Sequence, residues 1–127
     1  MDQIGNSYQE NTAYFDEALG AGRSCDMVCR DLRLAGKRAR FWVIDGFGGD
    51  AILERMGAFW LALPEDALNG MEDMQQFADR FVTFMEVDVT RDRENIVTSV
   101  LMGKSLLLIE GLSGAALIDA KEYPSRS

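Results

Sequence analysis

Two neighbouring stretches of the chain predict a β-hairpin whose second strand lies inside a sheet. In residues 27–34, apolar side chains recur at alternate positions, which is typical of a half-buried strand. A turn is predicted at residues 35–37, and residues 38–45 return as a second strand. Residues 41–44 of this strand are apolar on both faces. That pattern is typical of a strand in the interior of a sheet.

The remaining elements alternate between helices and short strands. Ser7 is expected to cap a first helix, which Gly20 and Gly22 end. Three further helices are predicted: one from Asp50 to Pro64, one at 71–81, and one at 91–102 that ends at Gly103. Strands are predicted at 84–89, 105–110 and 115–119. We therefore expect a mixed α/β (α+β) fold, with a small mixed β-sheet of about five strands packed by about four helices.

Apolar residues at helical spacing define the predicted core faces of two helices. The stripe after Asp50 consists of Ile52, Met56, Phe59, Trp60 and Leu63. The stripe of the last helix consists of Ile96, Val97, Val100 and Leu101. We expect these side chains to be buried against the sheet.

The composition is that of a single folded domain. The chain has 127 residues, 47% hydrophobic and 27% charged, so we expect one soluble domain over residues 1–127. Its net charge is −8. Because phosphates bind clustered cations, this balance argues against nucleic acid or anionic lipid as a partner. The sequence shows no signal peptide and no run of about 20 apolar residues, so we expect no membrane insertion by this stretch.

The chain contains no histidine. This excludes Ser–His–Asp and Cys–His catalysis and zinc sites built on histidine, so we expect no enzymatic activity and no cofactor. Cys25 and Cys29 are the only cysteines. Their spacing is poor for a disulfide on a strand or a helix, so we expect reduced thiols, which fits a cytoplasmic compartment.

Three predicted strands end in a carboxylate, at Asp45, Glu110 and Asp119. One interpretation is a cluster at one sheet edge that holds Mg²⁺, and the other is that each carboxylate caps the turn after its strand. If 105–110 and 115–119 form an antiparallel hairpin, at most two of the three can converge, which favours the caps. The glycine-rich segment 46–50 precedes a predicted helix, which is where phosphate-binding loops lie. It matches neither the dinucleotide-binding fingerprint nor the P-loop, so a simple strand-to-helix turn is favoured.

Basic residues gather on the predicted hairpin of an otherwise acidic chain. They are Arg30, Arg33, Lys37, Arg38 and Arg40. This group is a candidate docking surface for an acidic partner. The alternative is a solvated face that protects an edge strand.

A set of short motifs runs through most of the chain. They are Phe41-Trp42-Val43-Ile44-Asp45-Gly46-Phe47 with the Ile-Leu-Glu-Arg-Met helix after it, residues 94–97, 99–103 and 106–111, and Ala116-Leu117-Ile118-Asp119 leading into Tyr123-Pro124-Ser125-Arg126-Ser127. By these motifs the chain resembles the GerA family of spore germination proteins. The stretch 10–15 is similar to the subgroup of the stage V sporulation protein AF type, and germinant receptor A subunits are the other subgroup.

The resemblance implies a place for the domain in a larger protein. Family members are integral proteins of the spore inner membrane, with a cytoplasmic part on the spore core side ahead of the membrane helices. They act with other subunits, and as oligomers, in the ion release that germinants trigger. Residues 123–127 would then begin a linker to a part beyond this chain. The family offers no catalytic motif. Its candidate motif residues here are Asp45, Gly46, Asp119, Tyr123, Pro124 and Arg126.

Overall fold

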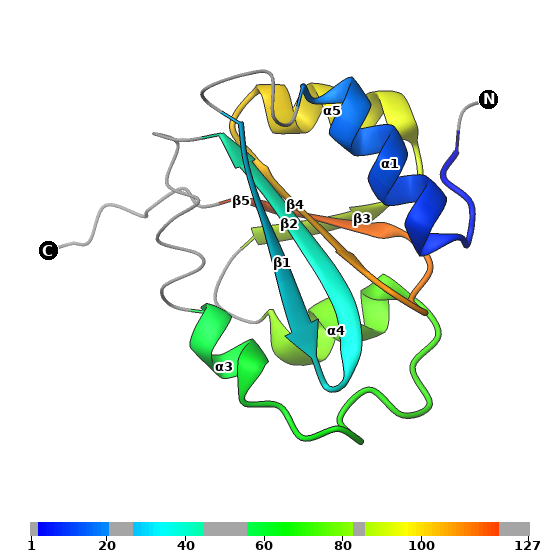
Figure 1. Ribbon diagram of the computed structural model, residues 1–127, viewed down its shortest axis with the longest axis vertical. Helices are drawn as coiled ribbons and strands as arrows, with labels where there is room; N and C mark the ends of the chain where they lie inside the picture. Colours follow the sequence, from blue (N-terminus) through cyan, green and yellow to red (C-terminus); the bar gives the residue numbers. More distant parts are fainter. Residues whose placement is uncertain (1–2, 21–26, 45–55, 83–85, 120–127) are drawn as a thin grey trace, which may run out of the picture.

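The computed structural model describes residues 3–20, 27–44, 56–82 and 86–119 (Figure 1). Its helices are α1 (Tyr8–Ala18), α3 (Ala58–Leu61), α4 (Met74–Phe81) and α5 (Arg93–Leu101). Its strands are β1 (Met27–Leu34), β2 (Lys37–Ile44), β3 (Glu86–Thr90), β4 (Ser105–Ile109) and β5 (Ala115–Asp119). Within these residues the fold class is confirmed, with five strands and four helices.

The five strands form one sheet in the order β1-β2-β4-β5-β3, and each neighbouring pair is antiparallel. The interleaving of helices and strands had suggested a mixed sheet. Antiparallel pairing results because β5 lies between β3 and β4, which are joined through α5 and run parallel to each other without touching. The two edges of the sheet are β1 and β3.

Helices cover both faces of the sheet (Figure 1). The side chains of Phe41, Leu107 and Ile118 belong to a core with α3 and α4. The side chains of Trp42 and Leu106, from the same strands, belong to a second core with α1 and α5. The prediction of an interior strand at β2 is therefore confirmed, because its central residues alternate between two cores.

Two residues of the predicted helical stripes lie outside these cores. Phe59 is 49% exposed and Leu101 is 56% exposed, so both predictions of burial were wrong. The neighbouring residues Trp60 and Val100, which were also predicted to be buried, are fully buried. Adjacent residues of an α-helix point about 100° apart around its axis, so Phe59 and Leu101 turn away from the sheet where Trp60 and Val100 face it.

Side-chain caps fix the starts of three helices. Ser7 accepts from the backbone N–H of Glu10 at the start of α1, as predicted. Asp73 forms a capping box with Gln76 at α4, and Asp92 caps α5. The predicted cap at Asp50 lies outside the described residues. No helix in the described ranges is long and apolar enough to cross a membrane.

The turn between β1 and β2 has two residues with positive φ, Ala35 (52°) and Gly36 (82°). This is the geometry of a type I′ turn, whose twist matches that of the strands it joins. The turn fixes the register in which Arg33 faces Arg38 and Asp31 faces Arg40 across the hairpin. The register thereby decides which basic side chains share a face.

Candidate interaction site on the β1–β2 hairpin

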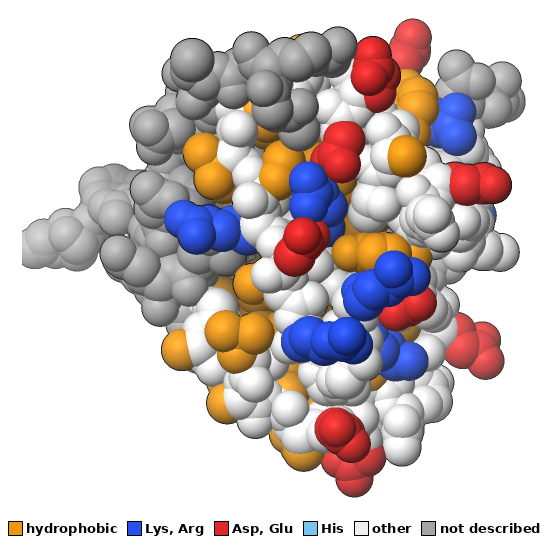
Figure 2. Space-filling model, viewed as in Figure 1, with side chains coloured by type: hydrophobic (Ala, Val, Ile, Leu, Met, Phe, Trp, Pro, Cys, Tyr) orange, Lys and Arg blue, Asp and Glu red, His pale blue; other side chains and the backbone are white. Residues whose placement is uncertain are grey.

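The five predicted basic residues lie on one hairpin but on both of its faces. Arg30 is paired with Phe41 in the register, and Lys37 with Leu34, so these two cations project on the side of α3 and α4. The other three, Arg33, Arg38 and Arg40, project on the side of α1. Figure 2 shows Lys and Arg side chains gathered on the face that carries this hairpin, with acidic side chains among them.

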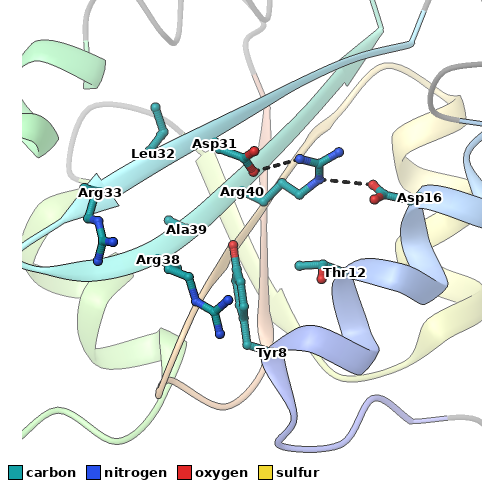
Figure 3. A pocket seen from close by; sticks show the side chains of 9 residues that line it. All are labelled: Tyr8, Thr12, Asp16, Asp31, Leu32, Arg33, Arg38, Ala39 and Arg40. Atoms are coloured by element: carbon teal, nitrogen blue, oxygen red, sulfur yellow. Dashed lines mark hydrogen bonds and ion pairs between the residues drawn. The ribbon is translucent and has the colours of Figure 1, made fainter.

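Arg40 is held between two carboxylates. Its Nε donates to Asp16 of α1 at 3.1 Å, and its Nη1 donates to Asp31 of β1 at 2.7 Å (Figure 3). The guanidinium also lies over the ring of Trp42, 5.4 Å from the centroid. Burial acts to lower the pKa of Arg40, and the two carboxylates outweigh it, so the pKa is raised. Arg40 therefore stabilises this domain internally and is not a free cation for a partner.

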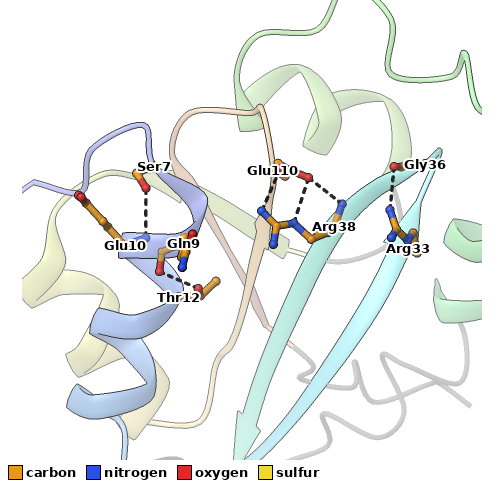
Figure 4. Close-up of polar contacts among 8 residues, drawn as sticks. All are labelled: Ser7, Gln9, Glu10, Thr12, Arg33, Gly36, Arg38 and Glu110. Carbon is orange, nitrogen blue, oxygen red and sulfur yellow. Dashed lines mark hydrogen bonds and ion pairs between the residues drawn. The ribbon is translucent and has the colours of Figure 1, made fainter.

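Arg38 forms a bidentate pair with Glu110. Its Nη2 and Nε donate to the two carboxylate oxygens at 3.1 and 3.3 Å, and its backbone N–H donates to Oε1 at 3.3 Å (Figure 4). Hydrogen bonds from Arg38 lower the pKa of Glu110 below its ordinary value. Both side chains are about half exposed, so the pair lies at the surface.

The other three cations have few contacts within the domain. Arg30 is exposed and has no hydrogen-bond or ion-pair partner in the described part of the chain. Among the residues that the structure describes, Arg33 donates to the carbonyl of Gly36 alone, at 3.2 Å (Figure 4). Lys37 is half-buried, and its charge helps to lower the pKa of Glu110. These three are the cations that remain available for an outside contact.

A groove of about 440 Å³ runs between α1 and the hairpin (Figure 3). One wall consists of Tyr8, Thr12 and Asp16 of α1, and the other carries Arg33, Arg38, Arg40 and Asp31 of the hairpin. The sequence analysis missed the three residues of α1 and Asp31. The spacing of four between Tyr8, Thr12 and Asp16 places them on one helix face, which is the signal that could have found them.

The two strand-end carboxylates in the described part of the chain, Glu110 and Asp119, do not lie at one edge of the sheet. Because β4 and β5 are antiparallel, Glu110 and Asp119 lie at opposite ends of their hairpin, as expected. Among the described residues, no group of three or more acidic or cysteine side chains is placed to hold a metal ion. Asp45, the turn at 46–50 and the motif residues Gly46, Tyr123, Pro124 and Arg126 lie outside the described residues.

Cys29 is a free, half-buried thiol on the α1 side of β1. Burial raises the pKa of this thiol. Cys25, the second cysteine, lies outside the described residues.

Comparison with known proteins identifies the family. Residues 13–127 match the family model described as Bacillus/Clostridium GerA spore germination protein. This match spans most of the chain, so the chain belongs to the GerA family of spore germination proteins, and the resemblance found in the motifs is confirmed.

Two relatives in this comparison are a curated sequence and a solved structure. Stage V sporulation protein AF of Bacillus subtilis (strain 168) is 24% identical over 121 residues, which is 93% of this chain and 24% of that protein. The crystal structure of the N-terminal domain of the A subunit of the Bacillus megaterium spore germinant receptor GerK3 matches with a TM-score of 0.76 at 20% identity. That match covers 95% of this chain and 49% of the crystallised chain. The chain thus spans about a quarter of the curated relative and half of the crystallised domain.

Proposed function

We propose that this domain is a non-catalytic interaction and regulatory domain of a spore germination membrane protein. It lies on the cytoplasmic, spore core side of the inner membrane and contributes to the ion release that germinants trigger. Its partners are other subunits of a germination receptor or channel complex and further copies of the same protein. The contact is made by the basic β1–β2 hairpin.

The observation that carries this proposal is that some hairpin cations are paired within the domain and others are not. Arg38 and Arg40 are engaged with Glu110, Asp16 and Asp31 of the same domain. Arg30 is exposed at the edge of the sheet and has no partner in the described ranges. An unpaired cation on a chain of net charge −8 is complementary to the acidic surface of a second copy.

A contact between the hairpin of one copy and an acidic face of the next is head-to-tail. Such a contact closes into a ring when the rotation between neighbours is fixed. Membrane helices would fix that rotation and would also raise the effective concentration of the domains. Since the chain contains no histidine, we assign its role to contacts of this kind rather than to catalysis.

The test changes the charge of two of the available cations, Arg30 and Lys37, in the full-length protein. The variant Arg30→Glu/Lys37→Gln alters the α3 side of the hairpin and leaves the Arg38 and Arg40 pairs intact. The control, Arg80→Glu/Lys104→Gln, changes the net charge by the same amount away from the hairpin, at Arg80 of α4 and at Lys104 between α5 and β4, where Lys104 pairs with Asp88 of β3. We expect the hairpin variant to lower ion release from spores after nutrient addition, while the control releases ions as the wild type does.

Two measurements make the result decisive. Immunoblotting of spore membranes checks that both variants are present at wild-type abundance, and circular dichroism of the isolated 127-residue chain checks that both fold. Normal ion release from spores that carry the hairpin variant would show that the hairpin is a solvated face and would contradict the proposal.

The second candidate function is a regulatory domain that senses a small ligand or Mg²⁺. One observation favours the small ligand, namely the groove between α1 and the hairpin. The melting temperature in the presence of Mg²⁺, Ca²⁺ or germinants separates the two candidates. A ligand-sensing domain predicts that one of them raises the melting temperature, whereas the interaction domain predicts no change.

A further inference from the structure

Two arginine side chains face each other directly across the hairpin. Arg33 of β1 and Arg38 of β2 are register partners on the groove side. Directly opposite residues of an antiparallel pair have Cβ atoms about 4.5–5.5 Å apart, and like charges in such a pair repel. Glu110 neutralises Arg38, but the only described acceptor for Arg33 is the carbonyl of Gly36. Arg33, Arg38 and Glu110 together therefore carry one net positive charge at the turn end of the groove, while Glu65 lies beside Gly36 of the turn.

Both guanidinium groups keep N–H donors that no described residue accepts. An arginine has five N–H donors. Arg33 uses Nη1, and Arg38 uses Nε and Nη2. Figure 3 shows both guanidinium groups on the groove side of the hairpin, that of Arg38 beside Tyr8, and Figure 4 shows Arg38 turned toward Glu110 and Arg33 toward Gly36. Planar guanidinium groups match the oxygen pairs of carboxylate and phosphate, so this end of the groove has the donors that such an anion requires.

The wall provided by α1 holds Arg38 and offers one more polar group. The Tyr8 ring lies under the guanidinium of Arg38, 5.1 Å from centroid to Cζ. Burial raises the pKa of Tyr8, and the negative charge of Asp31 raises it further. The hydroxyl of Tyr8 therefore stays protonated and remains a donor. Thr12 differs, because its hydroxyl already donates to the carbonyl of Gln9 at 3.0 Å.

The opposite end of the groove is acidic but occupied. Asp16 and Asp31 both accept from Arg40, and the positive charge of Arg40 between them disfavours a metal ion there. The groove volume of about 440 Å³ suits a small molecule. Charge and size together favour a small anion at the turn end over a cation.

We propose that the Arg33–Arg38 end of this groove binds a small anion that carries a carboxylate or phosphate group. The proposal develops the small-ligand candidate and does not depend on docking by Arg30 and Lys37. Binding would neutralise the repulsion between the two arginines and would join α1 to the hairpin through Tyr8.

The test is a nuclear magnetic resonance titration of the 127-residue chain with inorganic phosphate and, separately, with succinate. Sodium chloride at matched ionic strength controls for screening. We expect saturable shifts of the Nε–Hε signals of Arg33 and Arg38 that sodium chloride does not reproduce. Saturation by phosphate alone or by succinate alone supports the site and shows whether it binds a phosphate group or a carboxylate group.

Arg30 supplies the matched control, since it lies on the same strand and points to the other face. Arg33→Gln should lower the affinity for the anion by about tenfold or more, whereas Arg30→Gln should leave this affinity unchanged. Without anion, Arg33→Gln should not lower the melting temperature at low salt, because it removes a like-charge pair. Shifts that do not saturate, or that persist in Arg33→Gln, would overturn the site. That failure would leave the docking proposal standing, because docking is tested by Arg30 and Lys37.

Discussion

The indole nitrogen of Trp42 donates a hydrogen bond of 2.9 Å to a carboxylate oxygen of Asp16. The same oxygen accepts from Nε of Arg40 at 3.1 Å. One carboxylate of α1 therefore satisfies two neighbouring side chains of β2, one of them fully buried. This junction fixes the helix against the sheet and forms the inner end of the groove.

Removal of the Asp16 carboxylate should destabilise the domain. Asp16→Ala leaves the buried indole N–H of Trp42 without its acceptor, which costs about 1–3 kcal/mol. Asp16→Asn keeps an acceptor oxygen and should lose less. Urea unfolding followed by tryptophan fluorescence measures both. A loss below about 0.5 kcal/mol for Asp16→Ala would show that the junction does not hold α1 in place.

Trp60 should contribute far more to stability than its neighbour Phe59. Trp60 is fully buried and donates to the carbonyl of Phe81 at 3.1 Å, whereas Phe59 is 49% exposed. We expect Trp60→Ala to cost about 3–5 kcal/mol and Phe59→Ala about 1 kcal/mol or less. Chemical denaturation of the two variants gives the comparison. Similar losses at both positions would contradict the burial described for α3.

The hairpin turn should require glycine at position 36. Gly36 has a φ of 82°, and a Cβ there would meet no atom closer than 3.8 Å, so any loss from Gly36→Ala reports backbone conformation and not a clash. We expect a loss of about 1–2 kcal/mol. Gly57→Ala is the control, because Gly57 has helical φ and ψ and open space around it, and should be neutral or stabilising. Equal effects of the two substitutions would argue against the type I′ turn.

The Arg38–Glu110 pair should make stability depend on acid pH. The pKa of Glu110 is lowered from an ordinary value of 4.5. A lowered folded-state pKa stabilises the fold above the unfolded-state pKa, and this contribution is lost as the pH falls through the folded-state pKa. Wild type should therefore exceed Glu110→Gln in melting temperature near pH 6, and the difference should shrink toward about pH 3.

The control for this prediction is the same comparison without the arginine. In an Arg38→Ala background, the pH-dependent effect of Glu110→Gln should be smaller than in the wild type, because the backbone N–H of residue 38 and the charge of Lys37 remain next to Glu110. A pH-independent difference between wild type and Glu110→Gln would mean that the ion pair adds nothing to stability.

The elements could be predicted from the sequence wherever the signals were local. The two strands of the hairpin and β5 lie at or within one residue of their predicted bounds, because alternation and turn residues are read over a few positions. The opposite faces of Arg30 and Arg33 were also readable, since their spacing of three puts them on opposite sides of a strand.

The contacts of the site could not be predicted in this way. Asp16 reaches Arg40 over 24 positions, and Glu110 reaches Arg38 over 72. The first pair depends on how α1 packs on the sheet and the second on the pairing of β2 with β4, and no local sequence pattern encodes either arrangement. The predicted burial of Phe59 and Leu101 was wrong for a related reason. An apolar residue of a helix faces the core only if the helix is rotated so that this residue points toward the sheet.

The most direct test of the docking proposal is photo-crosslinking from position 30 in the full-length protein in spore membranes. A photoreactive residue replaces Arg30, and the same residue at the exposed position 101 of α5 serves as the control. We predict that position 30 crosslinks to a second copy or to another germination receptor subunit, identified by mass spectrometry, and that position 101 does not. The absence of such a product from position 30, in spores that respond normally to nutrients, would contradict the account.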